Sequence, residues 1–130
     1  MSRTAVTVTA LAANTAAAFI AGTTGTAIDA TNGHSIAPPA GKAVEKLVVI
    51  ITNTTASTKA ATVKAGANPP ADAQGAGDLA VSLTDGSTTP QSKVLVLSSA
   101  RFAQADGTIN IDIAAGMTGF ITCFSLPKAF

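Results

Sequence analysis

Apolar residues along this chain occur in short runs that alternate with small polar residues, and clusters of Gly, Pro, Asn and Asp separate the runs. Such alternation places every second side chain on the same face of a β-strand. The only stretch that fits a helical period is 10–18, and residues 98–107 have room for one helical turn. The pattern therefore predicts seven or eight short strands, at 4–11, 19–21, 44–52, 59–65, 79–83, 93–97, 108–113 and 119–126.

The last two predicted strands are separated by a Gly-Met-Thr-Gly stretch at 116–119. This spacing predicts a hairpin, with Ile109, Ile111 and Ile113 on one face of its first strand. The strand at 59–65 is likewise predicted to pair back onto the strand at 44–52, the most apolar run of the chain.

Residues 22–42 are predicted to form a loop-rich region. The Asn32-Gly33 pair is a strong turn signal, and the Pro38-Pro39 pair excludes a central strand because proline has no amide hydrogen to donate. We therefore expect no central strand at this point of the region.

Short strands at intervals near 8–12 residues are typical of β-sandwiches and barrels. We therefore predict an all-β fold, a single-domain antiparallel β-sandwich that is jelly-roll-like or Ig-like. The domain is expected to span residues 1–130, with an extended N-terminal segment at 1–13. The side chains predicted to be buried in its core are Val49, Ile51, Val81, Ile109, Ile111 and Phe124.

The amino-acid composition reduces the number of function classes that fit this chain. Charged residues make up 12% of the chain, against roughly 25% in an average domain, and the formal net charge is +1. Without a basic stripe, a nucleic-acid partner is not expected. The chain has five Phe but no Trp or Tyr, which argues against sugar binding and base stacking.

A membrane partner is not expected either. The longest strongly apolar run, Leu47–Ile51, is far shorter than the roughly 20 residues that a spanning helix needs. The N-terminus faintly resembles a signal peptide, but Val6 and Val8 alternate with threonines and fit a strand better. Export stays open as a minor alternative, and without it the Asn-Thr-Thr triplet at Asn53 is only a turn.

The reactive side chains are few and scattered. The lone cysteine, Cys123, is flanked by Ile121 and Phe124 and is predicted to be a small buried residue rather than a nucleophile. The lone histidine, His34, has no His or Cys nearby with which to bind zinc. Most acidic residues sit beside Gly or Pro, where Asp caps turns through the backbone. We therefore predict no enzyme activity, no catalytic residues, no cofactor and no metal site.

Phe102 and its neighbour Arg101 are the most conspicuous pair outside the predicted strands. We predict that Phe102 plugs the end of the sandwich, while Arg101 stays solvated or pairs with an Asp.

Three segments occur in a characteristic order: "IDATNGHSIAPPAGKAVEKLVVIITNTTASTKAATVKAGANPPA", then "GDLAVSL", then "SSARFAQADGTINIDIAAGMTGFITCFSLPK". This order resembles small structural proteins of tailed bacteriophages, the head decoration or minor capsid proteins. The resemblance covers about two-thirds of the chain, and its motifs are structural rather than catalytic.

The resemblance implies a capsid decoration protein that binds the outer surface of the phage head and stabilises capsomer contacts. Its partners would be the major capsid protein and sibling subunits, with a trimer expected because capsid lattices offer three-fold sites. It would be made in the host cytoplasm and reside in the virion, on the capsid surface. The predicted contact residues are Arg3, Thr4, Val6, Pro127, Lys128 and Phe130.

Two other classes stay open. The chain could be a tail- or fibre-associated module, or another β-sandwich that binds carbohydrate or a cell surface. The least favoured class is a small hydrolase on a β scaffold, because the chain offers one His, one Cys and no clustered acids.

Overall fold

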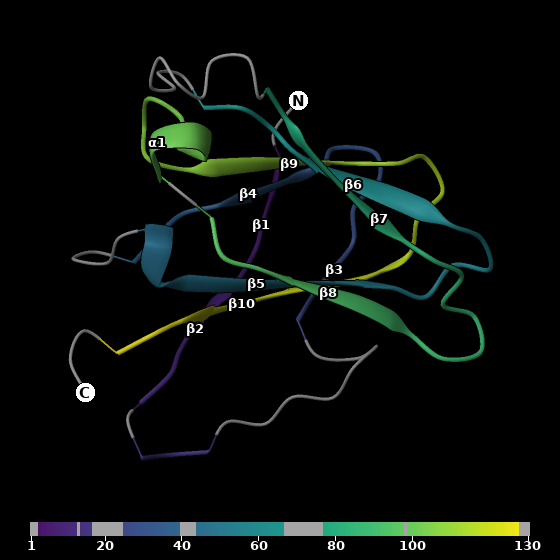
Figure 1. Cartoon of the computed structure of the whole chain (residues 1–130), viewed down its shortest axis with the longest axis horizontal. Helices are drawn as coiled ribbons and strands as arrows, with labels where there is room; N and C mark the ends of the chain where they lie inside the picture. The colour runs from purple at the N-terminus through teal and green to yellow at the C-terminus, as the bar shows by residue number, and fades with distance from the viewer. Residues whose placement is uncertain are drawn as a thin grey trace.

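The computed structural model describes residues 3–12, 14–16, 25–39, 44–66, 77–97 and 99–127. These residues form two five-stranded sheets that pack face to face, as the two layers in Figure 1 show. The all-β sandwich predicted from the alternating pattern is therefore confirmed. A short 3₁₀ turn at Val44–Lys46 and a one-turn helix, α1 at Ser99–Phe102, complete the regular structure of the described residues.

The first sheet has the strand order β1-β4-β9-β6-β7. Its strands are β1 (Thr4–Ala5), β4 (His34–Ile36), β9 (Ile109–Ile113), β6 (Lys59–Val63) and β7 (Leu79–Leu83). The second sheet has the order β2-β10-β5-β8, and β3 also pairs with β10. Its strands are β2 (Val8–Ala10), β10 (Gly119–Ser125), β5 (Leu47–Asn53), β8 (Gln91–Leu95) and β3 (Thr26–Ala27).

The strand order identifies the type of sandwich. From β3 to β10, every connection except that between β6 and β7 passes from one sheet to the other. The sheet β3-β10-β5-β8 then faces the sheet β4-β9-β6-β7, with antiparallel pairing throughout. This arrangement is the double Greek key of a jelly roll.

The structure corrects the strand count and the expected pairing direction. The described residues contain ten strands rather than seven or eight, and both sheets are mixed because β1 and β2 pair in parallel with β4 and β10. The strand predicted at 4–11 is divided between the two sheets. The region 22–42 contains β3 and β4, whose two or three residues are too few to display an alternating pattern. The prediction at 19–21 lies outside the described residues.

The predicted hairpins at 108–126 and 44–65 are wrong. Strand β9 lies between β4 and β6, whereas β10 lies in the opposite sheet and pairs with β5. Strand β6 likewise pairs with β7 and β9 rather than with β5. Alternation assigns a side chain to a face but does not specify which strand lies alongside.

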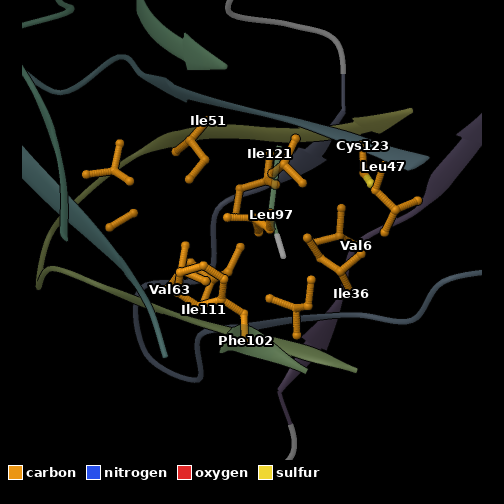
Figure 2. Close-up of a cluster of buried hydrophobic side chains, with 14 of the residues drawn as sticks. Val6, Ile36, Leu47, Ile51, Val63, Leu97, Phe102, Ile111, Ile121 and Cys123 are labelled. Atoms are coloured by element: carbon orange, nitrogen blue, oxygen red, sulfur yellow. The ribbon is translucent and has the colours of Figure 1, made fainter. Parts of the chain in front are cut away.

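The core fills the space between the sheets, as Figure 2 shows for Ile51, Ile111 and Ile121 among others. Five of the six residues predicted to be buried are at most 5% exposed: Val49, Ile51, Val81, Ile109 and Ile111. The prediction for Phe124 is wrong, because Phe124 is only partly buried. Its neighbour Cys123 takes the inward position on β10, so Phe124 points to the other face.

The segment 3–10, which we call the N-terminal strap, joins the two layers. It contributes β1 to the first sheet and then β2 to the second, so it closes one open side of the sandwich (Figure 1). Between these strands Val6 enters the core with 5% exposure (Figure 2).

Candidate functional site

Three aspartates serve as hydrogen-bond acceptors for their own turns, as the sequence predicted. Their side chains accept backbone N–H groups two or three residues further on: Asp29 from Thr31 and Asn32, Asp85 from Ser87, and Asp106 from Thr108. Hydrogen bonds also lower the pKa of each of these carboxyls, because they favour its ionised form. The largest cause is the Thr4 hydroxyl for Asp29, the Ser87 N–H for Asp85 and the Thr108 hydroxyl for Asp106. Within the described residues, no group of three or more His, Cys, Asp or Glu side chains comes together to hold a metal ion.

Cys123 is a core residue, as predicted. Its side chain is fully buried on β10, and burial raises the pKa of its thiol to about 11. Since the thiolate is the reactive form of cysteine, this sulfur is unsuited to nucleophilic chemistry in the folded chain.

We expect Cys123 in the native protein not to react with dithionitrobenzoate at pH 8, because the thiol is both buried and protonated. The same protein in denaturant is expected to release one equivalent of thionitrobenzoate. The measurement is absorbance over time, and native labelling as fast as in the denatured control would contradict a buried Cys123.

Asn53, in the Asn-Thr-Thr triplet, is a buried structural residue at the end of β5. Its Nδ2 donates to the carbonyls of Thr84 (2.8 Å) and Ser57 (3.1 Å), while its Oδ1 accepts the N–H of Thr55 (2.9 Å). These bonds tie the turn after β5 to the turn after β7. In the folded chain the Asn53 amide is therefore inaccessible to glycosylation.

Three segments that are far apart in the sequence meet at one corner of the sandwich. Gly66 N–H donates to the carbonyl of Arg101 (2.7 Å), and the Gln104 side chain donates to the carbonyl of Ala65 (3.0 Å). The Arg101 guanidinium reaches the carbonyl of Gly77 (3.3 Å from its Nη2). We call this the α1 corner, comprising residues 64–66, 77–78 and 99–108.

Close packing at the α1 corner explains why Phe102 and Gly66 occupy their positions. Phe102 is 4% exposed and plugs the end of the sandwich, as predicted (Figure 2). The Arg101 guanidinium lies over its ring, 4.7 Å from the ring centre. A Cβ at Gly66 would collide with the backbone at Phe102 and Ala103, so only glycine allows this close approach. Phe102 and Gly66 therefore contribute to the packing of the fold at this corner.

A shallow pocket of about 350 Å³ lies beside the α1 corner. It is lined by Ala37, Pro38, Val44, Ala103, Asp106, Gly107 and Thr108. Its one carboxylate, on Asp106, accepts hydrogen bonds from both the N–H (3.1 Å) and the hydroxyl (2.7 Å) of Thr108. The hydroxyl of Thr108 and the carboxylate of Asp106 in this lining are thus bonded to each other.

Charged residues form a chain of ion pairs across the first sheet. Arg3 contacts Asp112 (2.6 Å), Asp112 lies 3.8 Å from Lys64, and Lys64 contacts Asp78 (2.7 Å). The hydrogen bond that Lys64 donates to Asp78 raises the pKa of Lys64 and lowers the pKa of Asp78. These exposed pairs position the strap and the α1 corner, and each contributes little to stability.

The predicted contact residues fall into three environments. Arg3 is paired with Asp112, Thr4 donates its hydroxyl to Asp29 (2.7 Å), and Val6 lies in the core. Pro127 is partly buried after β10, while Lys128 and Phe130 lie outside the described residues. The structure therefore brings Arg3, Thr4 and Val6 together in the strap, and the contacts described for them lie within the chain. Their assignment to an interface stays a prediction.

Among the described residues, the large apolar side chains most exposed to solvent lie elsewhere, near the end of β8 and just after it. Val94 is 63% exposed and Val96 is 65% exposed, and Val94 pairs in register with the partly buried Ile50 of β5. We call Val94 and Val96 the β8 strip. The sequence contains a signal that identifies it: the run Val94–Leu97 is apolar at every position, so when Leu97 faces the core, valines must face outward.

Comparisons of this chain with protein-family models, with curated proteins and with solved structures find no match. Within the described residues, no helix has the length and apolar character needed to cross a membrane.

Proposed function

We propose that this chain is a non-enzymatic capsid decoration protein that binds the outer surface of a tailed-phage head through apolar contacts. The observation that carries the proposal is the β8 strip, two valines more than 60% exposed in a chain with only 12% charged residues. Large apolar side chains that gather on a surface are a common mark of a protein–protein interface.

The fold and the resemblance also support this proposal. Jelly rolls recur in viral capsid domains, which is an argument by analogy of fold alone. The ordered segments that resemble phage decoration proteins meet at the α1 corner, where they act as scaffold. A decoration protein needs this combination, a rigid core with an apolar contact surface and no active site.

The test is binding of the purified protein to expanded, undecorated capsids of the matching phage at several salt concentrations. We expect saturable binding that changes little with salt, because apolar contacts are not screened as ion pairs are. Absence of saturable binding at every salt concentration would refute the proposal. Loss of binding at moderate salt would refute its apolar part.

Variants at the β8 strip test whether it is the surface that binds the capsid. We expect the double variant Val94→Asp/Val96→Asp to bind at least about tenfold more weakly, which corresponds to about 1.4 kcal/mol. The matched control is Ser82→Asp, which adds a carboxylate at an exposed position on β7 in the other sheet. Equal binding by the double variant and the control would exclude the β8 strip as the contact surface.

The second candidate, a carbohydrate-binding module, rests on the occurrence of jelly rolls among lectins. The absence of Trp and Tyr counts against it. A saturable signal on a glycan array, with no binding to capsids, would favour this candidate over decoration.

A further inference from the structure

The first half of the N-terminal strap is attached to β4 by few backbone bonds. Thr4 N–H donates to the carbonyl of Gly33 (3.0 Å), and Val6 N–H donates to the carbonyl of Ser35 (2.9 Å). Strand β1 is only two residues long and lies at the edge of its sheet. Edge segments with few bonds are the parts of a fold that open most easily.

The imidazole of His34 adds a third attachment, from a fully buried position. Its Nδ1 lies 3.2 Å from the carbonyl oxygen of Thr4, and its Nε2 lies 2.8 Å from the backbone nitrogen of Asp29. A carbonyl can only accept and an N–H can only donate. The ring must therefore be neutral, with its proton on Nδ1 and the lone pair of Nε2 facing the Asp29 N–H.

A second proton on His34 is incompatible with this arrangement. It would place an Nε2–H donor against the N–H donor of Asp29, which would leave that amide without its acceptor. The ring must then move, and its bond to the Thr4 carbonyl is lost with it. The protonation state of His34 is thus coupled to the attachment of the strap.

The charges around the ring act in opposite directions. Burial is the largest influence and lowers the pKa of His34, and Arg3 lowers it further. The Thr4 carbonyl and the Asp29 carboxylate raise it. Asp29 is itself held by the Thr4 hydroxyl and by Asn32, and Arg3 is paired with Asp112 on β9.

We propose that His34 is a proton-sensitive clasp. The neutral ring holds residues 3–6 against β4, and protonation releases them and opens the side of the sandwich that the strap closes. The Val6 side chain leaves the core in this step, and the edge of β4 becomes available for pairing. The clasp is independent of the proposed capsid-binding function.

The test is amide hydrogen exchange in the wild-type protein, corrected for intrinsic rates, between pH 7.5 and 5.5. Well above pH 6.5 the ring is neutral in both closed and open states, so protection is constant. Below it the open state binds the proton, and opening becomes easier as the pH falls. At Thr4 and Val6 we expect opening to increase about tenfold over this range.

The control amides are those of Leu11 and Thr54, which donate to the carbonyls of Ser125 and Thr118 away from His34. Their protection is expected to stay constant. An unchanged protection of Thr4 and Val6, or an equal loss at all four amides, would overturn the clasp. In the variant His34→Gln, which cannot titrate, the pH dependence at Thr4 and Val6 is expected to disappear, and its persistence would also overturn the clasp.

Discussion

Replacing Gly119 by Ala is expected to lower the free energy of unfolding by about 3–5 kcal/mol. Gly119 begins β10 with a φ of +141°, a conformation that residues with a side chain rarely adopt. A Cβ there would overlap the carbonyl of Thr52 on β5. Relieving that overlap requires β10 and β5 to separate at the point where their seven-residue pairing starts.

The matched control for this variant is Gly116→Ala in the same connection. Gly116 also has a positive φ, of +78°, but the nearest atom to its added Cβ is the Lys59 Nζ at 3.8 Å. The backbone strain then acts without a collision, and the expected loss is about 1 kcal/mol. Urea unfolding of both variants gives the comparison, and equal losses would contradict the role of the Thr52 carbonyl.

Replacing Ile111 by Ala is expected to cost about 2–5 kcal/mol of stability. Ile111 is fully buried (Figure 2), at the centre of β9. Strand β9 itself lies between β4 and β6. Its register partners on those strands, His34 and Val63, are fully buried too. Neighbours held by strand pairing on both sides collapse poorly into the space left by the missing atoms, which keeps the cavity open.

The control for the Ile111 variant is Val94→Ala, because Val94 is 63% exposed on β8. Its loss is expected to stay within about 0.5 kcal/mol, the usual range for a surface substitution. Both values come from urea unfolding curves. A loss well below 2 kcal/mol for Ile111→Ala would mean that the side chain is less enclosed than its position in β9 indicates.

The faces of β7 and β9 were predictable because apolar and polar residues alternate along these two strands. In β7, Val81 and Leu83 are buried, while Ala80 and Ser82 are exposed, as predicted. The same rule correctly placed Ile109 and Ile111 in the core. Predicting a sandwich required only these faces and the regular spacing of the turns.

The neighbour of each strand could not be predicted in this way. The connection at 114–118 is short enough for a hairpin, yet it crosses between the sheets, because nothing in a period of two distinguishes these outcomes. Strands β1 to β4 have two or three residues each and take their conformation from tertiary pairing rather than from local preference.

Some features of the candidate site could likewise be predicted from the sequence, and others could not. The environment of Cys123 and the turn-capping role of Asp29 follow from residue type and neighbours, and both predictions are confirmed. The contact between His34 and Thr4 joins residues that are 30 positions apart, so no local pattern reveals it. Predicting that Val94 and Val96 face outward would have required knowing which side of the strand faces the core.

The position of β10 in the second sheet has a consequence for biosynthesis. This strand comes last among those described, yet it lies between β5 on one side and β2 and β3 on the other. While a ribosome is still translating the preceding residues, these three earlier strands lack their main partner and expose unpaired backbone. The sheet therefore closes only once Ser125 has left the exit tunnel, and until then the unpaired edges of the earlier strands are open to edge-to-edge association.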